Sequence, residues 1–352
     1  MSAAERAVCL RGSETAAEGG RWALAPALAL AYPGAVWLLF RAAGWARDTS
    51  GFDRAVGWLG VAAALALCAG PSVAAFASLR RNSGSPRPRW TVDLLAFGTP
   101  ALYTLLRVLL ASAQTQLDDA LLWGPAWVVA MLVASRPGRA PLSPARAPEV
   151  MPSKLQVAHG VGAAAVLTAF LLVHVANQAL GLLGVPVHEA ALQALRRWYR
   201  AAWVEPLLLA AFGFLVVSGV RLLGRRRGGE EVGGPWPTLQ LATGAGLVPF
   251  ILAHVTVVLG ARALLHVETD WAFASGGAEG LLGSLGNTRL LPYYWLAVFA
   301  VVAHVGAGLR VVLLAHRWRR SVVDRLALVV TIAGALGAST IVAALCGLRL
   351  GG

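Results

Sequence analysis

Charged residues are scarce in this chain of 352 residues. Lys, Arg, Asp and Glu together make up 13% of it, whereas 57% is hydrophobic. Cysteine is also rare, and Cys9, Cys68 and Cys346 show no CxxC spacing, so we expect them to pack as small apolar residues rather than bind metal. A water-soluble fold cannot bury so much apolar surface, so the composition predicts a protein that lies in lipid.

The sequence also lacks the two-residue alternation that is typical of membrane β-strands. Its apolar runs are continuous, and lipid-exposed backbone satisfies its polar groups only in helices or closed barrels. A helix needs roughly 20 apolar residues to cross the hydrocarbon layer. We therefore predict an all-α, polytopic transmembrane bundle of about nine spans. The runs lie at about 22–44, 55–79, 92–113, 119–135, 155–184, 202–224, 238–262, 291–315 and 326–348.

Lysine is nearly absent, since 29 of the 30 basic residues are arginine, and the formal net charge is +13. Such a charge can indicate a nucleic-acid partner.

Here a basic cluster follows every even-numbered run, which instead predicts cytoplasmic loops in a bacterial-type inner membrane, with the N-terminus inside and the C-terminus outside. Residues 1–20 show no signal-peptide pattern, so the first run is expected to remain a span. The clusters contain Arg80, Arg81, Arg87 and Arg89; Arg136, Arg139, Arg146 and Lys154; Arg221, Arg225, Arg226 and Arg227; and Arg317, Arg319, Arg320 and Arg325.

Histidine is absent from the first 158 residues. The proline-rich stretch 136–154 separates these residues from a second half that holds all seven histidines. We therefore predict a four-helix membrane extension of unassigned role at residues 1–150 and a five-helix block at residues 151–352.

Three histidines lie deep inside apolar runs. Placing an ionisable side chain at such a depth costs roughly a few kcal/mol of insertion free energy, so these residues usually have a partner or a function. His174 and His254 lie at similar depth near the outer face, and two such imidazoles can hold one haem iron between them. His304 lies further inward and would serve a different haem. In the alternative interpretation, all three are core histidines that bond to carbonyls or hydroxyls of adjacent helices. The others are expected to be solvated or interfacial, at helix ends or in loops: His159, His188, His266 and His316.

From about residue 153 to 348 the chain resembles the cytochrome b membrane-anchor subunit of succinate dehydrogenases and fumarate reductases, in its single-chain, five-helix, di-haem form. Three short motifs carry the resemblance. They are His174-Val175-Ala176-Asn177-Gln178 with His159 fifteen residues earlier, Leu239-Gln240-x-x-Thr243-Gly244 followed by His254, and His304-Val305-Gly306-Ala307-Gly308-Leu309.

The resemblance implies haem b near the outer face on His174 and His254, with iron as the bound metal. It also implies an inner haem on His304 and a histidine of the second family helix, but residues 212–221 contain none. Three interpretations of the inner site stay open. It is empty, it holds a five-coordinate haem on His304, or it takes a ligand such as Met131 from the additional helices.

In function, the resemblance implies a non-catalytic anchor that passes electrons between an iron–sulfur subunit and quinone. A flavoprotein and the iron–sulfur subunit would dock on the cytoplasmic side, against basic loops such as 221–227 and 316–325. One alternative is a degenerate membrane protein of the same fold, with one or no haem, that serves in binding or structure. Another is a free-standing transmembrane b-type oxidoreductase, which would need two histidine pairs.

A quinone needs only a pocket near a haem edge with one or two polar groups. Glu205, at the outer start of the sixth run, is the best candidate for such a group. In the alternative interpretation, it is an interfacial carboxylate that pairs with Arg197 or Arg200. Arg221 and Arg310 are weaker candidates for contacts with haem propionates, since arginines at inner helix ends also serve as ordinary membrane anchors.

Overall fold

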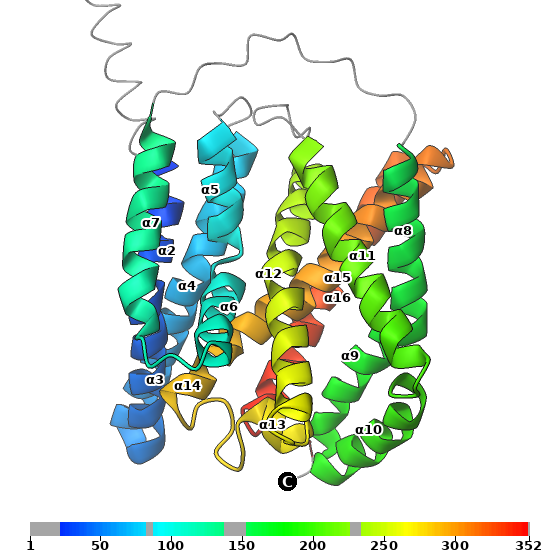
Figure 1. Ribbon diagram of the computed structural model, residues 1–352. Coiled ribbons are helices and arrows are strands. Elements are labelled where there is room, and N and C mark those ends of the chain that lie inside the picture. Colours follow the sequence, from blue (N-terminus) through cyan, green and yellow to red (C-terminus); the bar gives the residue numbers. More distant parts are fainter. Residues whose placement is uncertain (1–21, 82–86, 137–152, 226–233, 351–352) are drawn as a thin grey trace, which may run out of the picture.

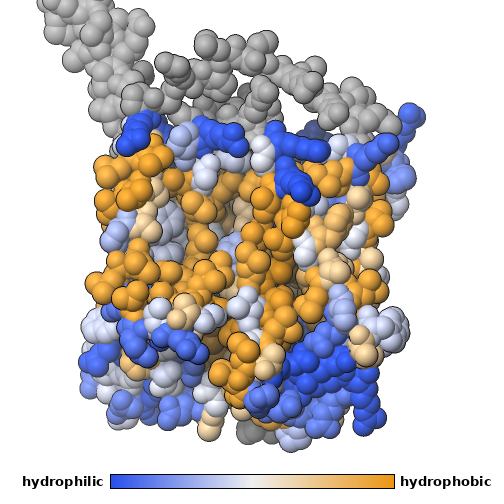
Figure 2. All heavy atoms as spheres, in the orientation of Figure 1, coloured by the Kyte–Doolittle hydropathy of each residue, from blue (hydrophilic) through white to orange (hydrophobic). Residues whose placement is uncertain are grey.

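The computed structural model describes residues 22–81, 87–136, 153–225 and 234–350. Within these ranges every regular element is a helix and none is a strand, which confirms the predicted all-α class. Six helices are long and apolar enough to cross a membrane, and the number rises to eight if each of two bent helix pairs is one span. An apolar belt lies between two polar bands (Figure 2). The chain is therefore a multi-pass membrane protein.

The first half of the chain contains two broken helices where continuous runs were predicted. α2 and α3 meet at 56°, and α5 and α6 meet at 78°. Pro33 and Pro100 stand in the first turns of α3 and α6. A proline ring removes an N–H donor and clashes with the preceding turn, so it begins a helix well but does not continue one. The helices are α2 (Leu24–Leu30), α3 (Tyr32–Asp48), α4 (Gly51–Arg81), α5 (Arg87–Phe97), α6 (Thr99–Ser112) and α7 (Asp119–Ser135).

The second half begins with a composite span of 30 residues. It consists of α8 (Lys154–Val166), the π-helical turn η1 (Leu167–Leu171), α9 (Leu172–Ala179) and the 3₁₀ turn η2 (Leu180–Leu183). The helix α10 (Val185–Tyr199) follows and was not predicted. The remaining helices are α11 (Val204–Arg225), α12 (Pro235–Ala263), α13 (Trp271–Ser275), α14 (Leu285–Thr288), α15 (Leu290–Ala315) and α16 (Arg320–Leu345).

The two ends of the bundle differ in what they carry (Figure 1). Helices α4, α11 and α15 all end at the same end of the bundle (Figure 1). We call it the basic end, because it carries Arg80, Arg81, Arg225 and Arg317. The opposite end, which carries α10, α13 and α14, is the far end.

Burial is uneven across the bundle. One hydrophobic core runs from the first-half helices into α12, α15 and α16, and α12 packs against α4, α5 and α6. The predicted division near residue 150 falls in residues 137–152, outside the described residues. By contrast, in the most apolar stretches of the α8–η2 span and of α11, only 17% and 6% of residues are buried. The wall formed by α8, α9 and α11 therefore leaves most of its apolar residues uncovered by the rest of the bundle.

Candidate functional site

His174 of α9 and His254 of α12 face each other toward the far end, and we call them the far-end pair. Their ring centroids lie 6.1 Å apart and their planes meet at 66°. Each imidazole stacks on a phenylalanine four residues earlier, His174 on Phe170 at 5.0 Å and His254 on Phe250 at 5.4 Å. Residues four apart share one face of a helix, so each phenylalanine covers one face of its histidine. The structure thus brings together the two histidines that the sequence paired.

The core-histidine alternative expects hydrogen bonds for these rings. Within the described part of the chain, His174 and His254 make ring contacts but no hydrogen bond. Both rings are half-buried. Their nitrogen lone pairs are therefore available to a ligand.

His159 of α8 and His304 of α15 form a second pair nearer the basic end, which we call the basic-end pair. Their ring centroids lie 6.5 Å apart and their planes meet at 86°. His159 lies near the start of α8, as expected, but its ring is partly buried and hydrogen-bonded to Ser218. His304, for which the sequence showed no partner, has this histidine beside it. The partner comes from the first helix of this half, α8, and not from α11, where the family resemblance placed it.

Hydrogen bonds orient both rings of the basic-end pair. His304 Nδ1 lies 2.9 Å from the Gln240 carbonyl oxygen, which can only accept, so Nδ1 carries the proton. His159 Nδ1 lies 2.8 Å from Ser218 Oγ, which donates its own proton to the Phe214 carbonyl at 2.6 Å and so accepts from the ring. These tautomers, assigned from the hydrogen-bond network, leave both Nε2 atoms with free lone pairs. Metal-ligating histidines are usually held in this way.

A glycine of α12 makes room for His304. A Cβ atom added at Gly244 would lie 2.7 Å from Cε1 of that ring, closer than atoms tolerate. Gly219 of α11 touches the other ring less closely, because its Cβ would lie 3.5 Å from His159 Cε1, an ordinary contact. The imidazole of His304 therefore lies directly against the backbone of α12.

The donor set suits a porphyrin-bound metal better than a bare ion. A bare transition-metal ion takes three or four protein ligands, and no group of three or more His, Cys, Asp or Glu in the described residues could hold one. Haem iron needs only two axial ligands from the protein. With metal–nitrogen bonds of about 2 Å and ring centroids about 1.1 Å beyond the nitrogens, two opposed imidazoles have centroids about 6 Å apart. The observed separations of 6.1 and 6.5 Å fit this requirement.

The two pairs are stacked along the axis of the bundle. His304 lies against residues 240–244 of α12, and His254 lies 10 to 14 residues further along the same helix. At 1.5 Å per residue, this places the pairs about 15 to 21 Å apart along that axis. Together they span much of the apolar belt.

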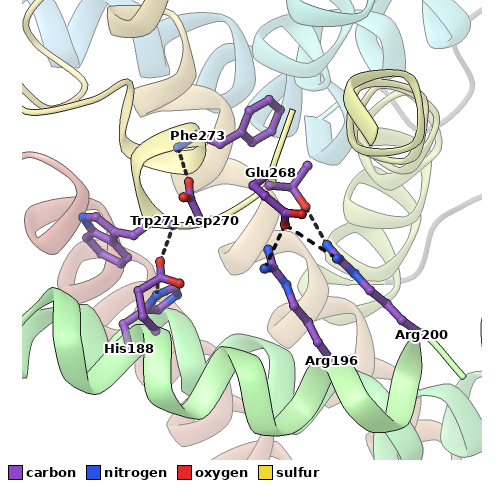
Figure 3. Close-up of polar contacts among 9 residues, drawn as sticks. His188, Arg196, Arg200, Glu268, Asp270, Trp271 and Phe273 are labelled. Atoms are coloured by element: carbon purple, nitrogen blue, oxygen red, sulfur yellow. Dashed lines mark hydrogen bonds and ion pairs between the residues drawn. The ribbon is translucent and has the colours of Figure 1, made fainter. Parts of the chain in front are cut away.

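His188 is a further histidine whose burial was not expected. It lies in the first turn of α10, at a helix end as expected, but it is buried rather than solvated, with 1% of its surface exposed. Its Nε2 lies 3.1 Å from Asn177 Nδ2, and its ring packs on Trp271 at 4.7 Å. Glu189 beside it accepts a hydrogen bond from the Trp271 backbone N–H (Figure 3). Burial lowers the pKa of His188 below its ordinary value of 6.5, and this outweighs the nearby carboxylates of Glu189 and Asp270.

We expect the far end to lose stability as pH falls below about 6.5. Because burial lowers the pKa of folded His188, the unfolded chain binds the proton first, and the free energy of unfolding decreases until pH passes below the folded pKa. Thermal unfolding followed by tryptophan fluorescence at pH 7.5 and 5.5 tests this. His188→Gln should weaken the dependence, whereas His316→Gln, at an exposed helix end, should keep it. An equal pH dependence in both variants would contradict the assignment.

Glu205 pairs with a different arginine from those expected. Its carboxylate accepts hydrogen bonds from two nitrogens of Arg262 on α12, not from Arg197 or Arg200. The pair borders a cavity of about 450 Å³ at the far end. This cavity is also lined by Arg200, Leu259, His266 and Glu268.

Three other candidate residues have ordinary surroundings. Arg310 is buried and its Nε donates to Asp324 of α16 at 2.6 Å, and Arg221 is exposed. Met131 lies on α7, which packs against α2, α5 and α6 in the first half of the chain. None of them is needed to complete either histidine pair.

No protein-family model, curated protein or solved structure matches this chain.

Proposed function

We propose that this chain is a transmembrane haem b protein that carries electrons between the two faces of a membrane. The far-end pair would hold one haem and the basic-end pair a second. The observation that supports this best is the separation of the rings in each pair, 6.1 and 6.5 Å, which suits one iron between two imidazoles.

Haem b supplies one-electron redox chemistry, and the chain supplies ligands and orientation. Ser218 and the Gln240 carbonyl hold the basic-end imidazoles with Nε2 free. Phe170 and Phe250 restrict the rotation of the far-end imidazoles. The wall of α8, α9 and α11 leaves most of its apolar residues unburied, and a porphyrin would cover those that face the histidine pairs.

The arginine distribution favours an orientation with the basic end in the cytoplasm of a bacterial-type inner membrane, the N-terminus inside and the C-terminus outside. By resemblance to the succinate dehydrogenase and fumarate reductase anchors, a flavoprotein and an iron–sulfur subunit would dock at this end. Electrons would then enter at the basic-end pair. Because that pair has two histidines, the long gap that a missing inner haem would leave does not arise.

At the far end, quinone is the proposed electron partner. The cavity beside Glu205 and Arg262 opens near the end of α12, about two turns beyond His254. It offers polar groups for a quinone head group and lies at the edge of the apolar belt, where a lipid-soluble molecule can enter.

The second candidate function is a free-standing transmembrane b-type oxidoreductase without soluble partners. Two histidine pairs within one chain are what such a protein needs, and this arrangement favours it over a degenerate anchor with one or no haem. The two candidates differ only in what binds at the basic end.

The deciding experiment is a haem count on protein purified from membranes in mild detergent. We expect about two haem b per chain and a reduced-minus-oxidised spectrum of b-type cytochromes. Absence of haem would overturn the proposal, and a single haem would overturn its two-site form. Flavin and iron–sulfur subunits that co-purify would identify the anchor, whereas two haems without them would identify the free-standing protein.

A further inference from the structure

The helix α10 forms a floor beneath the far-end pair. It packs against α9, α11 and α13, and its buried side faces into the bundle. Tyr199 of this helix contacts Phe170 at 5.5 Å, and Phe170 in turn stacks on His174. α10 therefore closes the far end of the bundle beside His174, and its inward side chains lie on that side of the pair.

Two of these side chains are arginines with unused hydrogen-bond donors. Nε and Nη2 of Arg196, and Nε of Arg200, are buried and have no partner among the described residues. Their other nitrogens are engaged: Arg196 Nη1 donates to Glu268 at 3.1 Å, and Arg200 Nη2 donates to the Thr269 hydroxyl at 3.0 Å (Figure 3). Nε and Nη2 form one edge of a guanidinium, the edge that binds both oxygens of a carboxylate at once. Arg196 thus offers a complete carboxylate-binding edge.

Within the described ranges, only one carboxylate pairs directly with these two arginines. Arg196 and Arg200 have 15% and 22% of their side chains exposed, and they share one carboxylate, that of Glu268, which is 71% exposed. Arg262, which could otherwise share a counter-ion, is already paired with Glu205. Burial and the neighbouring positive charges of Arg196 and Arg262 lower the pKa of Arg200. A buried hydrogen-bond donor without a partner is costly, so the three free donors favour an additional acceptor.

The position of the free donors decides the kind of ligand. They are sealed from water, so an anion from solution or a lipid head group reaches them only if the far end opens. A carboxylate on a molecule held inside the bundle would reach them from within, after a local shift of the side chains that cover these donors. Haem carries two propionate carboxylates at one edge of its ring.

We propose that Arg196 and Arg200 bind the propionates of a haem held by the far-end pair. This inference rests on the proposed function. It assigns α10 the role of closing the haem site from the far end, and it orients the porphyrin with its propionate edge toward that end. The positive charge of the two arginines would also favour the reduced haem.

The test compares Arg196→Gln with Arg197→Gln in the purified holoprotein. Arg197 is the neighbouring residue and is exposed, so it controls for the loss of charge. We expect Arg196→Gln to release its far-end haem to apomyoglobin about 10 to 100 times faster than the parent, since charge-assisted hydrogen bonds are lost. We also expect a lower midpoint potential of that haem, with both properties unchanged in Arg197→Gln.

Equal haem release and equal potential in both variants would overturn the inference. If Arg196→Gln does not accumulate, Arg196→Lys decides, because lysine keeps the charge but not the two-donor edge. It should keep the potential and release haem faster, and a release rate equal to that of the parent would overturn the inference. Stabilisation of the parent by millimolar succinate or phosphate, lost in Arg196→Gln, would identify a solution anion and would also overturn it.

A failure of the proposed function gives a different result. In that case the parent holds no far-end haem, or His174→Ala retains it. A far-end haem that depends on His174 but not on Arg196 refutes only the propionate contact.

Discussion

Replacement of His174 by alanine should remove the far-end haem and leave the basic-end haem in place. In the proposed site the side chain would be one of two axial ligands, and its ring lies 6.1 Å from that of His254. Loss of a residue that only orients a metal ligand typically lowers the metal affinity roughly 10 to 100 times. Loss of the ligand itself should lower the affinity further. We expect the haem content to fall from about two to about one per chain, measured as the pyridine haemochrome. His254→Ala should give the same result.

The matched control is His316→Ala, which removes an exposed histidine that belongs to neither pair. It should retain both haems. If His174→Ala and His254→Ala also retained both, the far-end pair would not be a haem site, and the two rings would be core histidines after all. A loss of both haems together would indicate unfolding, which the thermal melting of each variant would reveal.

Hydropathy predicted the helical class because a continuous apolar run satisfies its backbone in lipid only as a helix. It could not show the breaks at Pro33 and Pro100, because hydropathy measures composition and not the direction of a helix axis. It also missed α10, in which His188, Leu192 and Tyr199 recur at helical spacing and the first two are buried. Arg196 and Arg197 belong to this amphipathic helix and not to a loop.

The far-end pair could be predicted from the sequence, and a repeated spacing of phenylalanine and histidine supports it in addition to the motif comparison. Phe170 and His174 repeat the spacing of Phe250 and His254, and in both cases the aromatic ring stacks on the histidine. The basic-end pair was harder to predict. His159 lies fifteen residues, or about four turns, before His174, which places both on similar sides of one span. Whether His304 reaches His159 depends on how α8 and α15 pack, and local sequence carries little of that information.

The basic-end haem should depend on a glycine that is not a ligand. A Cβ at Gly244 would lie 2.7 Å from His304 Cε1 and 3.1 Å from its Nδ1. To relieve this contact the ring must move, which would break the 2.9 Å hydrogen bond from Nδ1 to the Gln240 carbonyl that orients the ring. We therefore expect Gly244→Ala to lower the affinity of the basic-end site for haem about 10 to 100 times, as removal of other orienting contacts does. The far-end haem should be retained as an internal reference.

Gly219→Ala is the matched control, because its new methyl group would meet His159 Cε1 at 3.5 Å, an ordinary contact. Both substitutions replace a helical glycine by alanine, which stabilises a helix by about 1 kcal/mol. A selective loss of haem in Gly244→Ala therefore cannot come from weaker helix formation. Potentiometric titration of the two haems in each variant measures the outcome. Equal retention in both variants would mean that the His304 ring adjusts without leaving the iron, and that its contact with Gly244 reflects packing alone.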